Sequence, residues 1–318
     1  MKNVSGGILG LAVGDAMGVP VEFISRQEIA KNPVVSMREY GTHDQPMGTW
    51  SDDTSLTLAL MDSIVEKNGI DYKDIMDRFS SWIMHNDYTA SGVAFDVGNA
   101  TGRAIMNYGR GMKPLECGGV SEYENGNGSL MRILPLAYYL KMQDNTSISY
   151  RMKVVHNVSA LTHRHPISLI GCGIYIHIAM ELLEGRLPLY EAVELGIKTA
   201  LEYYEGSMRN ELCAYSRIND LSKFKTLPER DIRSSGYVVH TLEAALWCLL
   251  NTNSYAECIL KAVNLGDDTD TVGAVAGGLA GIHYGLGKIP KDWLDVIVKR
   301  DYIESLCGRL EKQILNSK

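Results

Sequence analysis

GTWSDDTSLTLALMDSIVEK, residues 48–67, passes from a polar turn into an apolar helical pattern that predicts a buried helix over 54–69. Two adjacent acids, Asp52 and Asp53, stand where this helix would begin. A carboxylate or the hydroxyl of Ser51 at a helix N-terminus can cap free N–H groups, and a carboxylate also meets the positive end of the helix dipole. Taken alone, the acidic pair is explained by helix capping.

The same helical periodicity recurs along the chain and predicts an all-α fold, at 71–86, 129–142, 167–185, 188–206, 237–252, 254–266 and 271–285. The last of these stretches is rich in glycine and alanine, which suits a helix packed closely against another backbone. Alternating runs are short, as at 33–40, so convincing strands are scarce. Segments 34–50 and 207–236 are expected to be irregular, the second as a charged surface excursion.

Length and composition indicate an ordinary globular enzyme. The chain has 318 residues, 45% of them apolar and 22% charged. No linker or repeat divides it, so we expect one domain over 1–318. The net charge of −7 argues against a nucleic-acid partner, which needs a basic surface.

Cysteine usage and apolar runs bear on location. The six cysteines form no C-x-x-C pair and no zinc-like pattern with histidine, so we expect reduced thiols, several of them buried. Residues 1–18 make a poor signal peptide, because glycines interrupt the apolar run and Asp15 ends it. The longest uncharged stretches, such as 165–180, fall short of the about 18 apolar residues that span a membrane. We therefore expect a cytoplasmic protein without membrane association.

A second acidic cluster opens the apolar helix predicted at 271–285 and makes capping an insufficient explanation. It interleaves three acids with two hydroxyls, in the order Asp267, Asp268, Thr269, Asp270 and Thr271. Clustered carboxylates repel one another unless cations neutralise them. Oxygen ligands of this kind suit Mg²⁺, Mn²⁺ or Ca²⁺ rather than zinc, and the EF-hand loop with its central glycine and terminal glutamate is missing. Two such clusters facing each other would form a binuclear metal site.

Seven motifs in fixed order, covering roughly residues 5–290, resemble the ADP-ribosylglycohydrolase family, whose founding bacterial type is the dinitrogenase reductase-activating glycohydrolase. They read GGILGLAVGDAMGVPVEF, GTWSDDTSLTLAL, SGVAFDVGNATGRAI, GNGSLMRILPLA, THRHP, GYVVHTLEAALWCLL and GDDTDTVGAVAGGLAGIHYG. The resemblance implies a compact orthogonal helical bundle that binds two divalent cations, Mg²⁺ or Mn²⁺.

The resemblance also implies the metal ligands, which are Ser51, Asp52, Asp53, Asp268, Asp270 and Thr271. The family's first metal motif begins with threonine where this chain has serine. Serine keeps the oxygen ligand but lacks the β-branch that stiffens threonine, so a slightly lower metal affinity is expected. Asp267 stands where the family usually has glycine, and its role stays open between a solvated acid and an outer partner of the ligands.

Two further carboxylates match acidic positions of the family. Glu22, in GVPVEF, is implied to act near the ribose as general acid or base, against the alternative of a surface glutamate near a helix end. Asp96, in FDVGNATG, is implied to handle the leaving guanidine or a ribose hydroxyl, against the alternative of a helix cap.

The remaining motifs suit the nucleotide part of ADP-ribose. Gly126, Asn127, Gly128 and Ser129 precede a helical pattern, and free N–H groups at a helix start bind phosphate. A flexible turn is the alternative. His163 is a candidate pocket residue, His165 stays undecided, and Tyr237 is a candidate for stacking on adenine or for simple packing.

The implied function is a metal-dependent hydrolase that cleaves the glycosidic bond between ADP-ribose and a modified side chain. Arginine is favoured because Asp96 matches and the chain resembles the founding bacterial type. No Ser-His-Asp or Cys-His nucleophile stands out, which favours water as nucleophile and an oxocarbenium-like transition state. Two alternatives stay open: a non-catalytic relative that binds ADP-ribose, and a metal-dependent hydrolase of another nucleotide-like glycoside or phosphoester. The expected partner is ADP-ribose or an ADP-ribosylated protein.

Overall fold

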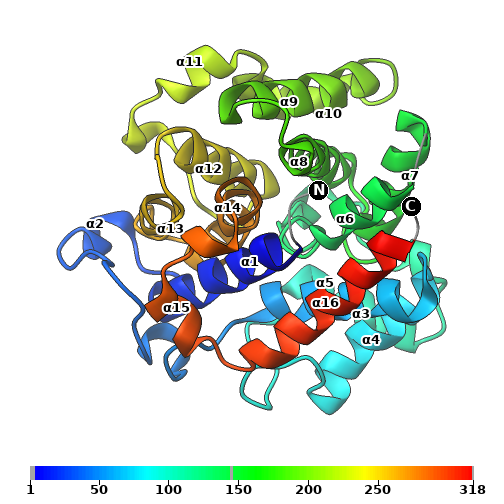
Figure 1. Ribbon diagram of the computed structural model, residues 1–318. Helices are drawn as coiled ribbons and strands as arrows, with labels where there is room; N and C mark the ends of the chain where they lie inside the picture. Colours follow the sequence, from blue (N-terminus) through cyan, green and yellow to red (C-terminus); the bar gives the residue numbers. More distant parts are fainter. Residues whose placement is uncertain (1–3, 144–145, 317–318) are drawn as a thin grey trace.

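The computed structural model describes residues 4–143 and 146–316 (Figure 1). The helix predicted from the opening stretch is α3, Asp52–Lys67, and Ser51 is its N-cap, accepting from the Asp53 N–H at 3.3 Å. Asn68 ends the helix in a left-handed conformation with φ 48°, one residue before the glycine expected to stop it. The capping interpretation of residue 51 is therefore correct, and it does not account for the two acids that follow.

The all-α prediction is confirmed, since the described residues form sixteen α-helices and only isolated β-bridges. The other α-helices are α1 Val4–Gly18, α2 Arg26–Ile29, α4 Tyr72–His85, α5 Asn99–Gly109, α6 Pro135–Met142, α7 Ile148–Ala160, α8 Pro166–Glu184, α9 Leu189–Glu205, α10 Arg209–Leu212, α11 Leu221–Lys225, α12 Val238–Leu250, α13 Tyr255–Val263, α14 Thr269–Tyr284, α15 Lys291–Val296 and α16 Arg300–Asn316. Short 3₁₀ helices connect them: η1 Val19–Val21, η2 Gly41–His43, η3 Pro114–Glu116, η4 Glu122–Glu124, η5 Cys213–Asn219, η6 Glu229–Asp231 and η7 Leu286–Lys288.

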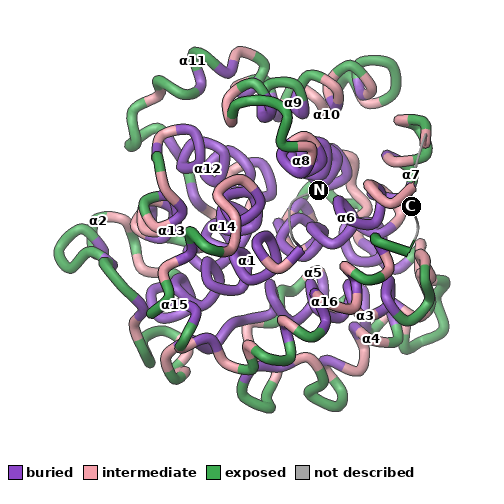
Figure 2. The backbone as a smooth tube through the Cα atoms, in the orientation of Figure 1, coloured by how far each residue is buried: buried purple, intermediate pink, exposed green. Residues whose placement is uncertain are grey.

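Helices α1 and α14 lie side by side in the middle of the bundle, and nearly all of their residues are buried (Figures 1 and 2). Their backbones touch through glycines, as the small residues of 271–285 predicted. A Cβ atom added to Gly273 would lie 2.4 Å from the Gly14 carbonyl oxygen, and one added to Gly14 would lie 2.0 Å from the Gly273 oxygen. This close contact brings the C-terminal part of α1 beside the N-terminus of α14, where the second acidic cluster begins.

Replacing Gly273 with alanine is expected to lower the free energy of unfolding by about 3 kcal/mol, because neither backbone can move away from the added methyl group. The matched control is Gly102→Ala in α5, where the nearest atom to the new Cβ would be Val97 Cγ1 at 3.5 Å. There the better helix propensity of alanine should stabilise the protein by about 0.5–1 kcal/mol. Urea unfolding followed by circular dichroism measures both. Equal effects at the two positions would contradict the close-packing explanation.

Two predicted segments differ from the structure. The helix expected over 129–142 begins only at Pro135, because proline lacks the N–H that an earlier start would require and fits the first helical turn. Segment 207–236, expected to be an irregular surface excursion, instead contains α10, η5, α11 and η6. It also contributes buried side chains to the core, namely Tyr215, Ile218, Leu221, Phe224 and Ile232. Segment 34–50 contains only the 3₁₀ turn η2 and is irregular as predicted.

Two windows, Val4–Val21 and Pro166–Glu184, are long and apolar enough to cross a membrane by length and composition. The uncharged stretches do fall short of a span, as expected, because the first window contains Asp15 and the second contains Glu181 and Glu184. The first window is 100% buried inside the protein and the second 83%, so both have the burial of core helices (Figure 2). The six cysteines are free thiols, and five of them are buried.

Candidate active site

The two acidic clusters meet where the N-termini of α3 and α14 come together. The hydroxyl of Thr271 on α14 donates to Asp53 Oδ2 on α3 at 3.3 Å, and the Ser51 hydroxyl donates to the same oxygen at 3.1 Å. Asp53 and Asp270 are completely buried. Positions separated by more than two hundred residues in the sequence therefore share one oxygen-lined centre.

Two sets of three carboxylate residues could each hold a metal ion. Within each set, one ligand atom from every residue lies within 4.8 Å of the others. One contains Asp15, Asp53 and Asp270, and the other contains Glu22, Asp268 and Asp270. Asp270 belongs to both groups, so the two sets of oxygens adjoin. Two adjoining sets of hard oxygen atoms suit two divalent cations such as Mg²⁺ or Mn²⁺.

Asp15 was not among the predicted site residues. It reaches α3 from the C-terminal part of α1 and accepts from the N–H groups of Ser51 at 2.9 Å and Thr54 at 3.0 Å. Its Oδ2 also accepts from the Thr54 hydroxyl at 2.6 Å. Burial raises the pKa of Asp15 to about 6, although these hydrogen bonds lower it. The signal that points to Asp15 is an ionisable residue inside an otherwise apolar stretch.

Without a bound cation, burying several ionised carboxylates in this centre would destabilise the folded protein. Burial first, and then the negative charge of neighbouring carboxylates, raises the pKa values of Asp52, Asp53 and Asp270 well above their usual range. Three buried oxygens of this centre have no hydrogen-bond partner among the described residues: Asp53 Oδ1, Asp268 Oδ1 and Asp270 Oδ2. Buried oxygens are normally satisfied, so these orphaned atoms are what bound cations would satisfy. The residues fit a divalent metal centre.

Glu22, which belongs to the second carboxylate set, also lies close to His43 and Asp96. The His43 Nε2 atom forms a short hydrogen bond with Glu22 Oε2, and the ligand atoms of all three residues lie within 4.8 Å of one another. Burial raises the pKa of Glu22 to about 7 and also raises that of Asp96. His43 lies in η2, within the segment expected to be irregular, and no periodic pattern singles it out in the sequence.

A pocket of 380 Å³ opens over these carboxylates. Nine predicted site residues line it: Glu22, Asp52, Asp96, Gly126, Asn127, Gly128, His163, Asp268 and Thr271. Ser51, Asp53 and Asp270 lie buried against the lining acids. The Ser129 side chain lies in the core, where it accepts from Ser159 at 2.9 Å and contacts Cys172.

The glycine loop forms one wall of this pocket. It is a turn rather than the start of a helix, since α6 begins at Pro135, so the expected helix N-terminus is absent from the described loop. Asn127 Nδ2 donates to Asp268 Oδ2 at 2.8 Å and thereby ties the loop to the acidic centre. A Cβ added to Gly128 would lie 2.8 Å from the His163 ring, so glycine is needed there. Burial lowers the pKa of His163 to about 3, which keeps this ring neutral at physiological pH.

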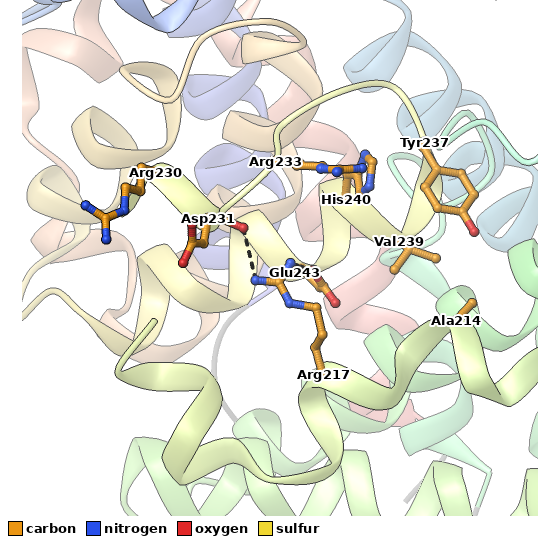
Figure 3. A pocket seen from close by; sticks show the side chains of 9 residues that line it. All are labelled: Ala214, Arg217, Arg230, Asp231, Arg233, Tyr237, Val239, His240 and Glu243. Atoms are coloured by element: carbon orange, nitrogen blue, oxygen red, sulfur yellow. Dashed lines mark hydrogen bonds and ion pairs between the residues drawn. The ribbon is translucent and has the colours of Figure 1, made fainter. Parts of the chain in front are cut away.

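Tyr237 lines a neighbouring pocket of 520 Å³ and pairs edge-on with His240, with ring centroids 5.0 Å apart (Figure 3). The residue before it, Gly236, lines the acidic pocket, so the two pockets adjoin at this point. Elsewhere in the lining of this pocket, Arg217 donates to Glu243 at 2.7 Å and to the Asp231 carbonyl at 3.0 Å (Figure 3). The tyrosine ring is half-buried and keeps one part accessible to a ligand.

Known proteins resemble the chain over nearly its whole length. The ADP-ribosylglycohydrolase family profile matches residues 1–318. ADP-ribosylarginine hydrolase Tri1 of Pseudomonas putida (strain GB-1) is 32% identical over 313 residues, which cover 98% of this chain and 78% of that protein. ADP-ribosyl-[dinitrogen reductase] glycohydrolase of Rhodospirillum rubrum is 32% identical over 314 residues, covering 93% and 91%.

A solved structure described as an ADP-ribosylglycohydrolase-related protein complex has the same fold. It matches with a TM-score of 0.80 at 34% identity, over 98% of this chain and 97% of that chain. Because the family match spans the whole chain, and named hydrolases of ADP-ribosylated groups resemble it along nearly all its length, this protein belongs to the ADP-ribosylglycohydrolase family and is an ADP-ribosyl hydrolase.

Proposed function

We propose that this enzyme removes ADP-ribose from arginine side chains of proteins, with two divalent cations, Mg²⁺ or Mn²⁺, held between α3 and α14. The observation that carries the proposal is the set of orphaned buried oxygens on Asp53, Asp268 and Asp270. A cluster of this kind repels itself unless cations are present. The preference for arginine is supported by the name of the Pseudomonas putida relative, an ADP-ribosylarginine hydrolase.

The residues that would hold the cations are Ser51, Asp52, Asp53, Asp268, Asp270 and Thr271, with Asp15 adjoining them. Cations held there would supply a means of orienting the ribose hydroxyls and the attacking water and of stabilising negative charge. Asp15 fixes the position of α3 by accepting hydrogen bonds from Ser51 and Thr54. Asn127 holds Asp268 in place from the opposite wall of the pocket.

Glu22 is our candidate for the proton transfer. Cleavage of the glycosidic bond builds positive charge on the ribose, and the departing group gains a proton. A carboxyl group with a pKa near 7 can both donate and accept a proton at neutral pH, and burial raises the pKa of Glu22 to about that value. Asp96, beside it, supplies a second carboxylate that can bind a positively charged leaving group.

The nucleotide part of the substrate would extend away from these acids. No backbone carbonyl among the described residues accepts from the N–H group of Gly128, which lines the pocket, so the turn can offer this group to the diphosphate. The adenine would then reach the accessible part of the Tyr237 ring (Figure 3). This direction keeps the phosphates away from Glu22 and Asp96, whose charge would repel them.

Glu22→Gln is expected to lower kcat by about 100- to 10,000-fold, because glutamine cannot transfer the proton. ADP-ribose binding should persist, since the amide keeps the shape of the side chain. Single-turnover release of ADP-ribose and a thermal-shift titration with ADP-ribose measure the two quantities. A variant that keeps wild-type kcat would exclude Glu22 as the proton-transfer group.

The proposed acceptor is tested with two peptides of matched sequence, one carrying ADP-ribosyl-arginine and one carrying ADP-ribosyl-serine. Release of ADP-ribose is followed with Mg²⁺, with Mn²⁺ and with EDTA. Faster metal-dependent release from the arginine peptide is the expected result. Release from the serine peptide alone would overturn the acceptor, and undiminished release in EDTA would overturn the metal requirement. Binding of ADP-ribose without release from either peptide would favour a non-catalytic relative.

A further inference from the structure

Phe23 combines two unfavourable features in one residue. Its side chain is 67% exposed, and its backbone has φ 62°, a left-handed conformation that bulky residues rarely adopt. It directly follows Glu22 and lines the acidic pocket. A residue that is both strained and exposed beside the carboxylate of Glu22 is a candidate for function, because backbone strain of this kind clusters at functional sites.

The strained conformation is held in place by the loop that carries the second acidic cluster. The Phe23 N–H donates to the Asp267 carbonyl at 2.6 Å, and the Asp267 N–H donates to the Ile24 carbonyl at 2.9 Å. Asp267 is itself left-handed, with φ 61°. The turn at residues 22–24 and the loop at Asp267 are therefore joined by two backbone hydrogen bonds. These bonds hold the Phe23 backbone beside the loop that carries Asp268.

The surroundings of the ring combine aromatic faces with negative charge. The His43 ring lies 6.1 Å from the Phe23 ring, measured between centroids, and the Phe95 ring lies 5.3 Å from His43 on its other side. Glu22 and Asp96 line the same pocket as Phe23. Aromatic faces attract planar cations, and carboxylates pair with guanidinium groups through two parallel hydrogen bonds.

We propose that Phe23, with the carboxylates of Glu22 and Asp96, forms an acceptor subsite that binds the planar guanidinium of an ADP-ribosylated arginine. This inference rests on the proposed function and adds the residue that distinguishes arginine from uncharged acceptors. A phosphate group would be repelled by the same two carboxylates, so the diphosphate end of ADP-ribose does not suit this position. A serine acceptor offers neither charge nor a flat face and would gain nothing from the ring.

Phe23→Leu tests the proposal, because leucine keeps apolar bulk and loses the aromatic face. We expect kcat/KM for the ADP-ribosyl-arginine peptide to fall by about three- to thirtyfold, the range that a cation–π contact supplies. Release from the ADP-ribosyl-serine peptide and the thermal shift caused by ADP-ribose should stay at wild-type values. Phe23→Trp keeps an aromatic face and should retain the preference for arginine. Agmatine, a small guanidinium compound, should inhibit Phe23→Leu more weakly than the wild type.

The matched control is Tyr40→Leu. Tyr40 is also an exposed aromatic residue with a left-handed backbone, 52% exposed with φ 61°, but it does not line the acidic pocket. This variant should leave both activities unchanged. Equal losses on the two peptides, or no loss in Phe23→Leu, would overturn the subsite while the wild-type activity still supports the proposed function. A wild-type enzyme that releases ADP-ribose only from serine would overturn both.

Discussion

Asp270→Asn is expected to lower kcat by about 1,000-fold or more, since it removes the carboxylate shared by the two groups of oxygens and with it several kcal/mol of metal-derived stabilisation. The same substitution should stabilise the protein in EDTA. Asp270 is fully buried among carboxylates, and the charge of Glu22 and Asp53 raises its pKa further. Asparagine removes one of these mutually repelling charges. We expect a gain of about 1–2 kcal/mol in the free energy of unfolding.

A fall in kcat together with a rise in the free energy of unfolding of Asp270→Asn would distinguish a metal centre from an ordinary buried hydrogen-bond network. If Asp270 served only to satisfy hydrogen bonds in the core, its replacement would lower both quantities. Asp267→Asn is the control, because it makes the same change of charge three positions away on an exposed residue. Asparagine also tolerates the left-handed backbone of that position, φ 61°. Thermal unfolding in EDTA and steady-state release of ADP-ribose measure both variants, and a less stable Asp270→Asn would contradict the interpretation.

The centre of the site could be predicted from sequence because its carboxylates stand in two short motifs. Asp52, Asp53, Asp268 and Asp270 are adjacent or nearly adjacent in the chain, so local acid density indicates them before any fold is known. Asp15 is isolated in its motif, and it joins the centre only because α1 packs against α14 through glycines. The apolar residues around Asp15 in the sequence single it out as unusual, but what it contacts depends on tertiary packing.

His43 and Phe23 escaped prediction for a different reason. Both depend on backbone that follows no period, in η2 and in the turn after η1. The left-handed conformation of Phe23 is set by hydrogen bonds to Asp267, nearly the whole chain away. Propensity alone would place neither of these residues there. The unusual aspartate in place of the family's glycine was visible in the sequence, but its role in bracing Phe23 was not.

The fold was predictable where helices are amphipathic and less so elsewhere. Helices such as α4 and α9 alternate buried and exposed faces and lie close to the predicted ranges. Helix α1 was not predicted as a helix, because fourteen of its fifteen residues are buried and an apolar stretch without a polar face has no period to detect. Helix α16 was also missed. The helical spacing of its buried residues is nevertheless present in the sequence, at Ile303, Leu306, Cys307, Leu310 and Ile314.

The largest effect on stability is expected from pH in the absence of metal. Burial raises the pKa of Asp15 from 3.8 to about 6 and that of Glu22 from 4.5 to about 7. A carboxyl group with a raised pKa binds its proton more tightly in the folded state, so its stabilising contribution is complete below the unfolded value. That contribution is lost as the pH rises through the folded value. Each group changes the free energy of unfolding by about 1.4 kcal/mol per pH unit between its two pKa values.

In EDTA we therefore expect stability to fall by about 3 kcal/mol or more between pH 5 and pH 8, which lowers Tm by about 6–12 °C. Metal binding requires deprotonated ligands, so added Mn²⁺ should act in the opposite direction and raise Tm far more at pH 8 than at pH 5. Mn²⁺ at a thousandfold excess over its Kd should add about 4 kcal/mol to the free energy of unfolding. Differential scanning calorimetry measures the change of Tm with pH over this range, once with EDTA and once with Mn²⁺.

In EDTA, the Tm of Asp270→Asn should depend less on pH than that of the wild type, because one buried acid is gone. Most of the rise in Tm caused by Mn²⁺ should also be lost, because the same substitution removes the carboxylate shared by the two sets. Asp267→Asn should leave both the pH dependence of Tm and the effect of Mn²⁺ unchanged. A Tm in EDTA that stays constant or rises from pH 5 to pH 8 would mean that the buried acids are charged and satisfied without metal. That result would contradict the binuclear centre, because carboxylates already satisfied by the protein leave no oxygen atoms that need a cation.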